Sequence, residues 1–441
     1  MARAVPGHSQ SYDATVNYTI LWYNFYMIGR AMTARILAGL TDAPVVVVQG
    51  ARQVGKTTLI KNLLETGAIK GEYHTLDNLP TLAAVQQDHL GFLERAKTHP
   101  LILDEVQRAP DDLFVSIKAD VDRDRKPGRF LLTGSANALF VPRLADALVG
   151  RVDLVTLYPF AQAEIEGVTS NLVDVLASGR VLPISQLTAS RHDVLTRALQ
   201  GGYPPLIDLK REERRQAWFD SYVSTILQRD VLELSKIQGL DEMPLLLTLL
   251  AARAATTLNI ADVSRSARIP VTTLNRYLTL FAATYLIHMV QPWSTNLNSR
   301  LVKAPKVLMV DTGLLAYALD VTLSQLELSP ALLGPLVENF AGMELIKLLT
   351  WSKTRGQLYH FRTHDRKEVD YVLECGGRVI GVEVKAANGV GAQDFKGLEA
   401  LKQEAGDRWQ RGVVLYTGQD ILPFGPDLQA LPIAALWSQL G

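Results

Sequence analysis

A run of β-branched residues followed by a glycine-bracketed loop most constrains how this 441-residue chain can fold. Residues 45–49 (VVVVQ) predict a strand that is buried on both faces, as in a parallel sheet. The next residues, GARQVGKT, match a phosphate-binding pattern of two glycines, a lysine and a hydroxyl residue. The backbone N–H groups of such a loop surround a phosphate, and the helix that follows directs its N-terminus at the anion. The segment therefore predicts a nucleotide-binding α/β domain.

Each residue of this loop has an expected role. Lys56 should reach the β- and γ-phosphate oxygens of ATP, and the Thr57 hydroxyl should bind Mg²⁺. The predicted nucleotide-binding residues are Gly50, Ala51, Arg52, Gln53, Val54, Gly55, Lys56, Thr57 and Thr58. An ordinary glycine turn is the alternative, but a strand, a loop and a helix in this order favour a phosphate site.

Two acidic residues end a second apolar strand. Residues 100–103 (PLIL) predict this strand, and Asp104 and Glu105 follow at its carboxyl end, where ligands bind in sheets of this kind. Asp104 can hold Mg²⁺, and Glu105 can orient and deprotonate the attacking water. A solvated acidic loop is the alternative. The neighbouring phosphate loop favours a hydrolytic site, with Glu105 and Lys56 as catalytic residues.

Further strands complete the predicted sheet. They are expected over residues 73–76, 130–133 and 152–157. Because these strands alternate with helical stretches, we predict a doubly wound α/β domain. The fourth strand ends in TGSAN, which places Ser135 or Asn137 beside the γ-phosphate as a catalytic sensor. A helix over residues 137–148 then leads to Arg151.

These motifs together resemble a known family. The segments QGARQVGKTTL, YHTLDN, LILDEVQRAPD, GRFLLTGSAN and LVGRVDLVTLYPFAQAE are similar in order and spacing to AAA+ ATPases of the AAA_14 group, usually followed by a DUF4143 domain. The resemblance implies that Arg151, or else Arg143, is a catalytic residue that reaches the γ-phosphate of a neighbouring subunit. Hydrolysis then requires a homo-oligomer, expected to be a hexameric ring. The alternative is that Arg151 pairs with Asp153 or Asp146 on its own surface.

A helical connector follows. Residues 185–240 are predicted helices with a break at GGYPP, similar to a signal of the family, and they should cover the nucleotide and move with its state. Arg229 and Asp230 either help to sense that state or form a structural pair.

Residues 258–292 have the spacing of a helix-turn-helix. A short helix from Ile260 and a longer one from Val271 are predicted, and the strand-like LIHMVQPW after them suggests a winged helix. The candidate DNA-binding residues are Thr272, Thr273, Asn275 and Arg276. Purely structural use of the motif is the alternative.

The C-terminal part predicts a separate α/β unit. Strand-like residues 369–374 and 379–386 place Asp370, Glu383 and Lys385 at the ends of adjacent strands. Two carboxylates can share a divalent ion there, and a lysine can position the attacking water.

The spacing Asp-x12-Glu-x-Lys is similar to that of the PD-(D/E)xK nuclease superfamily, to which the DUF4143 fold is related. The helix signature G-x-x-x-E of that superfamily is met by Gly334 and Glu338, whereas Val369 stands in place of its proline. The resemblance implies a second Mg²⁺ or Mn²⁺ at a candidate nuclease site, formed by Glu338, Asp370, Glu383 and Lys385. A fold that keeps these side chains only to bind or to brace is the alternative.

The charge balance and the cysteine content limit which binding partners and which cellular compartment are expected. Lys plus Arg and Asp plus Glu both number 45, so DNA contacts must come from local basic clusters, such as residues 123–129, 210–215 and 300–306. The single cysteine, Cys375, excludes internal disulfides and is typical of the cytoplasm. The apolar residues 18–28 fall short of the roughly 20 that a membrane span needs, so no membrane partner is expected. The first 26 residues are either an over-long gene start or a docking arm.

The expected organisation has five segments. They are an N-terminal extension (1–29), an AAA+ P-loop core (30–170), a helical lid (171–240), a winged-helix domain (241–325) and a restriction-endonuclease-like α/β domain (326–441). The expected function is an oligomeric ATPase that couples ATP hydrolysis to binding and remodelling of duplex or branched DNA, with candidate nuclease activity. The alternative is a nucleotide-controlled switch or scaffold that acts on a protein partner and carries an inert nuclease-like domain.

Overall fold

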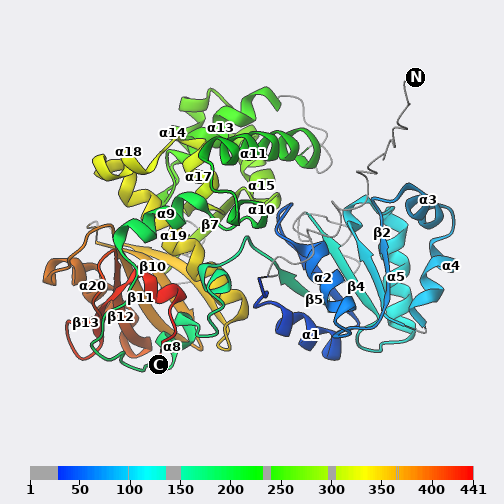
Figure 1. Ribbon diagram of the computed structural model, residues 1–441, viewed down its shortest axis with the longest axis horizontal. Coiled ribbons are helices and arrows are strands. Elements are labelled where there is room, and N and C mark those ends of the chain that lie inside the picture. Colours follow the sequence, from blue (N-terminus) through cyan, green and yellow to red (C-terminus); the bar gives the residue numbers. More distant parts are fainter. Residues whose placement is uncertain are drawn as a thin grey trace, which may run out of the picture.

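The computed structural model describes residues 28–97, 99–135, 150–231, 240–295, 304–363, 365 and 367–440. Figure 1 shows two lobes, one blue to cyan and one green to red. Asn137, Arg143, Asp146 and the helix expected over residues 137–148 lie outside the described ranges. Within them, no helix has the length and apolar character needed to cross a bilayer.

Five parallel strands form the sheet of the N-terminal lobe in the order β2-β3-β4-β1-β5. These strands are β1 (Val45–Gln49), β2 (Glu72–Thr75), β3 (Leu101–Asp104), β4 (Phe130–Gly134) and β5 (Val152–Thr156). β1 lies between β4 and β5, and its four valines are buried because helices cover both faces of the sheet. The predicted parallel α/β fold is therefore confirmed, and each predicted strand agrees with the observed one to within a residue.

The helices of this lobe connect the strands and cover the sheet (Figure 1). They are α1 (Thr33–Asp42), α2 (Lys56–Glu65), α3 (Leu79–Gln87), α4 (His89–Leu93), η1 (Glu94–Lys97), η2 (Val106–Arg108), α5 (Asp111–Arg123) and α7 (Gln162–Ile165). α2 begins directly after the loop that follows β1, so its N-terminus faces the carboxyl end of the sheet.

The connector helices lie with the green-to-red lobe (Figure 1). Its elements are α8 (Leu172–Ala177), α9 (Arg191–Gln200), α10 (Pro204–Ile207), α11 (Glu212–Thr225) and the π-helical turn η4 (Ile226–Asp230). Between α8 and α9, the Leu187 N–H donates to the carbonyl of Gln419 at 2.8 Å, and the Ile421 N–H donates to that of Ser185 at 2.7 Å. Part of the segment expected to be a lid therefore pairs with the C-terminal unit.

The second lobe contains a nine-stranded mixed sheet in the order β13-β14-β12-β11-β10-β9-β7-β8-β6. Its strands are β6 (Thr256–Thr257), β7 (Ile287–Pro292), β8 (Lys306–Met309), β9 (Gly356–Arg362), β10 (Glu368–Cys375), β11 (Arg378–Lys385), β12 (Trp409–Tyr416), β13 (Leu422–Pro423) and β14 (Leu428–Pro432). β7 pairs in parallel with β9. The middle and C-terminal units therefore share one continuous sheet, which the sequence did not indicate.

Helices surround this sheet. They are η5 (Leu240–Glu242), α13 (Met243–Ala251), α14 (Ile260–Ala267), α15 (Val271–Ala283), α17 (Thr312–Ala318), α18 (Leu323–Leu328), α19 (Pro330–Trp351), η6 (Ala392–Phe395), α20 (Lys396–Ala405), η7 (Gly406–Arg408) and η8 (Ile433–Trp437). α14 and α15 begin at the predicted residues. The apolar positions that define the helix-turn-helix spacing are all buried, namely Val263, Ala267, Ile269, Leu274, Leu278 and Phe281.

The long helix α19 joins the two lobes. Its buried Glu344 accepts the backbone N–H of Gln162 at 2.7 Å. The Lys347 ammonium donates to the Phe160 carbonyl at 3.0 Å and to Glu344 at 2.8 Å. A helix of the C-terminal unit is thus bonded directly to the loop after β5.

Candidate nucleotide and nucleic-acid sites

The loop between β1 and α2 has the geometry of a phosphate-binding loop. Gly50 and Gly55 have φ angles of 153° and 93°, which favour glycine. A Cβ atom on Gly50 would lie 2.0 Å from the carbonyl oxygen of Leu157. The buried Lys56 ammonium donates to the carbonyls of Gly50 and Ala51 at 2.9 and 2.8 Å. All the predicted loop residues, 50–58, lie in this turn and the start of α2.

Lys56 sits in an environment that works against its charge. Burial lowers its pKa to about 8, although the Glu105 and Asp104 carboxylates raise it in opposition. A bound phosphate adds further negative charge beside the ammonium and favours its protonated form. The lysine is therefore placed to respond electrostatically to a nucleotide.

Asp104 lies at the carboxyl end of β3 and is almost fully buried. The Thr57 and Tyr73 hydroxyls each donate to Asp104 Oδ2 at 2.7 Å, and the Thr133 hydroxyl donates to Oδ1. A hydroxyl and a carboxylate that meet beside a phosphate loop are hard oxygen donors, which fit Mg²⁺. Thr57 and Asp104 would hold this ion, which neutralises phosphate charge when bound.

Glu105 is connected to Ser135 through a residue that the sequence interpretation did not single out. Glu105 adopts a positive φ of 60° directly after β3. The Gln107 amide donates to Glu105 Oε2 and, at 3.0 Å, to the Ser135 hydroxyl, while its oxygen accepts the Ser135 N–H at 3.3 Å. The only signal for Gln107 in the sequence was its place two residues after Glu105, on the short turn η2.

A cavity of about 300 Å³ opens beside the phosphate loop. Its walls are Ile28, Gly29, Arg30, Thr33, Val54, Gly55, Thr58, Leu59, Asn62, Phe160 and Pro204. The Arg30 guanidinium lies 4.3 Å from the centre of the Phe160 ring. Apolar walls with a planar cation next to a phosphate loop can accommodate a nucleobase. The sequence interpretation missed this cavity because its walls come from four distant segments; the GGYPP break, which contains Pro204, was the one available signal.

The connector reaches the phosphate loop through an ion pair. Arg52 Nε lies 2.6 and 2.7 Å from the two carboxylate oxygens of Asp230, which is buried. Arg229 lies 4.0 Å from Asp77 instead. Of the two residues whose role was open, Asp230 contacts the predicted nucleotide site directly.

Arg151 pairs with Asp122 on α5, at 2.5 and 3.0 Å. Asp153, one of the two partners considered from the sequence, instead pairs with Arg35 at 2.5 Å. The Arg151 side chain is 23% exposed, and its pair lies at the surface. Because a surface ion pair contributes little free energy, Asp122 would compete only weakly with a phosphate for Arg151.

The helix-turn-helix presents its candidate DNA-binding residues to solvent. Thr272, Asn275 and Arg276 are exposed on α15, and Thr273 is half-buried. The strands β7 and β8 follow these helices and pair with each other antiparallel. This arrangement is compatible with the predicted winged helix, which stays a prediction.

The four candidate nuclease residues come from α19, β10 and β11. Asp370 Oδ2 accepts the Val384 N–H at 2.9 Å, and the Lys385 ammonium donates to Glu383 at 2.8 Å. Burial and the Asp370 charge raise the pKa values of both Glu338 and Glu383.

A second lysine enters this cluster. Lys306, the first residue of β8, donates to Glu338 and lies 3.5 Å from Asp370 Oδ1. Among the described residues, no three His, Cys, Asp or Glu side chains are grouped so that they could hold a metal ion. Because the Lys306 ammonium already pairs with Glu338 and Asp370, the cluster does not fit the second divalent ion that the nuclease resemblance implies.

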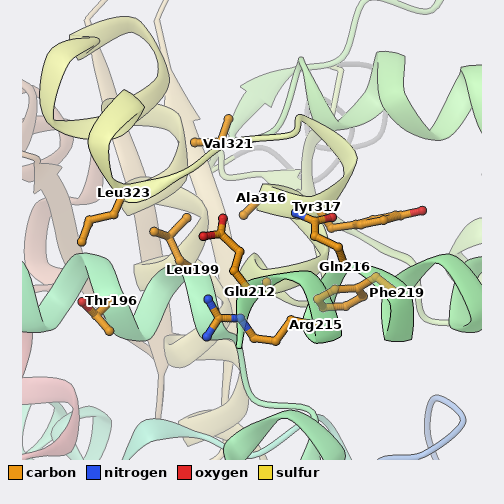
Figure 2. Close-up of a pocket in the computed structure, with 11 residues that line it drawn as sticks. Thr196, Leu199, Glu212, Arg215, Gln216, Phe219, Ala316, Tyr317, Val321 and Leu323 are labelled. Atoms are coloured by element: carbon orange, nitrogen blue, oxygen red, sulfur yellow. The ribbon is translucent and has the colours of Figure 1, made fainter. Parts of the chain in front are cut away.

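A further cavity of about 200 Å³ lies within the second lobe, between the connector helices α9 and α11 and the helix α17. Figure 2 shows Glu212, Arg215 and Phe219 on one side and Ala316 and Tyr317 on the other. Arg215, from the basic cluster predicted over residues 210–215, is among its lining residues. It lies at the contact of α11 with α17.

Comparison with known proteins places the chain in a family. A family model described as an AAA domain matches residues 42–166, and domains of unknown function match residues 191–325 (DUF8612) and 333–436 (DUF4143). Uncharacterized proteins of Mycobacterium tuberculosis (Rv2008c) and Mycobacterium bovis (Mb2031c) are each 32% identical over 357 residues, which are 81% of this chain and 73% of theirs. The chain belongs to this AAA_14–DUF4143 family. Its AAA domain makes it an ATP hydrolase, as the phosphate loop predicts.

Solved structures with some likeness to this family member include two bacterial proteins. DnaA from Aquifex aeolicus, bound to AMPPCP, is 14% identical, with a TM-score of 0.28 over 56% of this chain and 85% of that chain. RuvB from Thermotoga maritima is 17% identical, with a TM-score of 0.27 over 58% of this chain and 85% of that chain. Both TM-scores are low, so neither likeness carries an argument about this chain.

Proposed function

We propose that this ATPase works as a homo-oligomer, a hexameric ring, that uses ATP and Mg²⁺ to bind and remodel DNA. Translocation or branch migration on duplex or branched DNA is the proposed action, in the cytoplasm. The observation that carries the proposal is the exposed start of α15, where Thr272, Asn275 and Arg276 face solvent. In a helix-turn-helix, these positions of the second helix meet base edges.

A path of direct contacts supports coupling between the nucleotide and this surface. Asp230 follows α11 and binds Arg52 of the phosphate loop. α11 packs against α17, where the Tyr317 hydroxyl donates to Asp220 at 2.7 Å. α17 in turn packs against α13, and α13 against α14. A nucleotide that changes the Arg52–Asp230 pair would thereby move the base of the helix-turn-helix.

The cavity in Figure 2 lies on this path. Side chains of both helices line it, and the rings of Phe219 and Tyr317 stack beside it. A movement of α11 would therefore act on α17 through these stacked rings and the Tyr317–Asp220 hydrogen bond.

The proposed ring gives Arg151 its role. The Arg151 guanidinium would leave Asp122 and bind the γ-phosphate of a neighbouring subunit. Its positive charge would then stabilise the negative charge of the transition state. We do not assign DNA cleavage to the C-terminal unit, since its carboxylate cluster already holds Lys306.

DNA binding by the full chain tests the proposal. Fluorescence anisotropy with duplex and branched DNA should show affinity that falls as salt increases, because phosphate contacts release counterions. Arg276→Ala should weaken binding and reduce the salt dependence. Lys396→Ala, which removes an exposed cation from α20, is the matched control and should leave binding unchanged.

The competing function is a nucleotide-controlled switch or scaffold for a protein partner. The zero net charge of the chain favours it, because a neutral protein has no overall attraction for nucleic acid. If the chain shows no salt-dependent DNA binding and Arg276→Ala behaves like the wild type, the switch or scaffold replaces DNA remodelling as the proposed function.

A further inference from the structure

The candidate nuclease cluster contains the side chain of Lys306, which comes from another part of the sheet. Lys306 begins β8, in the middle unit, whereas Glu338 lies on α19 and Asp370 on β10. The Lys306 ammonium donates to Glu338 and, at 3.3 Å, to the Asp370 carbonyl. It also lies 3.5 Å from the Asp370 carboxylate and 5.1 Å from the centre of the Tyr371 ring.

These surroundings account for a charged lysine in the interior. Lys306 is only 7% exposed. Burial works against its charge, but the Glu338 and Asp370 carboxylates more than offset this effect and raise its pKa. A buried ammonium is tolerated when its donors are satisfied and opposite charges lie close, and both conditions hold here.

We propose that the Lys306 ammonium takes the place of a divalent ion, so that the cluster is an ionic tie between the middle and C-terminal units rather than a metal-dependent nuclease site. The tie joins three elements, namely β8, α19 and β10. It does not depend on the proposed action on DNA, because it concerns only whether this cluster can accept a metal.

The remaining groups of the cluster support the same assignment. Glu383 is paired with Lys385, and one oxygen of Asp370 is taken by the Val384 N–H. A divalent ion would have to enter beside two ammonium groups, at a cost in repulsion that a buried site magnifies. Glu383 Oε2 has no hydrogen-bond partner among the described residues, and it can join the Glu338 and Asp370 carboxylates in binding a cation once Lys306 is removed.

The first test is Mn²⁺ binding to the nucleotide-free full chain, followed by electron paramagnetic resonance. The wild type and Asp370→Asn should bind the same amount of Mn²⁺. Lys306→Met should gain about one Mn²⁺ per chain, through the carboxylates that the lysine releases. The gain should disappear in Lys306→Met/Asp370→Asn.

Two results of this test would overturn the proposal. One is Mn²⁺ bound by the wild type and lost in Asp370→Asn, which would show that the lysine does not exclude the metal. The other is a folded Lys306→Met that gains no Mn²⁺. DNA cleavage by the wild type with Mg²⁺ or Mn²⁺ that is lost in Asp370→Asn would have the same meaning.

Thermal unfolding tests the tie without any metal. Lys306→Met should lower the Tm by about 5 °C or more, since it leaves buried carboxylates unpaired. Lys306→Met/Glu338→Gln removes both charges of the pair and should recover part of this loss. If Lys306→Met alone does not fold, a folded double variant still supports the tie, and an unfolded double variant contradicts it. The exposed Lys396→Met is the matched control and should not change the Tm; a Lys306→Met as stable as the wild type overturns the tie.

Discussion

Arg52 of the phosphate loop holds both carboxylate oxygens of Asp230, at 2.6 and 2.7 Å, and thereby joins the nucleotide site to the end of the connector helix α11. The pair is poorly exposed, so water screens it little. Asp230 therefore places a negative charge near the position where phosphates bind, and it withholds Arg52 from them.

Asp230→Asn should therefore tighten ATP binding. Removing one negative charge beside the phosphate site favours the anion by on the order of 1 kcal/mol, or about 5-fold in Kd. Isothermal titration calorimetry measures this directly. Asp208→Asn changes an exposed aspartate of the connector and should leave the Kd unchanged. Weaker binding by Asp230→Asn would show instead that Asp230 positions Arg52 for the phosphates.

The lowered pKa of Lys56 predicts that ATP binding depends on pH. The free protein loses the Lys56 proton as the pH rises through about 8, whereas the bound phosphates favour the charged ammonium. Binding above pH 8 should thus take up a proton, and affinity should fall as the pH increases. Calorimetry in buffers of different ionisation enthalpy measures this uptake. Proton-independent binding between pH 7 and 9 would contradict the assigned environment of Lys56.

Gln107 should affect hydrolysis only through Glu105. Gln107→Met keeps the size of the side chain but loses the bonds to Glu105 and Ser135, so kcat should fall by about 10- to 100-fold with little change in KM. In a Glu105→Gln background, the same substitution should cause no further loss. Gln87→Met, at an exposed position of α3, is the control. A second, independent loss in the Glu105→Gln background would mean that Gln107 acts by another route.

Subunit mixing tests the role of Arg151 in the proposed oligomer. Arg151→Ala should keep nucleotide affinity but lose turnover, and Lys56→Ala should lose turnover through its own phosphate site. In a mixed oligomer, an Arg151→Ala subunit keeps an intact phosphate site. It can lie beside a Lys56→Ala subunit, which keeps an intact Arg151. ATP turnover should therefore recover partly in the mixture. No recovery, together with lower stability of Arg151→Ala, would assign Arg151 to its surface pair with Asp122.

Local patterns were sufficient to predict the ATPase sheet and its loop. The valines of β1, the glycines of the phosphate loop and the acids after β3 are encoded within short segments, so periodicity and spacing locate them. The helix-turn-helix bounds follow from the same kind of information. Asp104 and Thr57 meet because parallel strands end at one edge of the sheet.

Contacts between distant segments could not be predicted in this way. Arg52 and Asp230 are 178 residues apart, and neither belongs to a pattern that names the other. Lys306 reaches Asp370 because β8 and β10 belong to one sheet, which depends on the β7–β9 pairing. Spacing along the chain predicted the acidic cluster, but it contained no information about the lysine that enters from another strand.

ATP turnover with and without DNA tests the central claim most directly. The rate of the full chain should be measured without DNA and with single-stranded, duplex and branched DNA, with the oligomeric state recorded in the same buffer. We predict that duplex or branched DNA raises kcat and that Arg276→Ala reduces this stimulation, whereas Lys396→Ala does not. A turnover rate that no DNA changes, in wild type and variants alike, would contradict a DNA-remodelling ATPase.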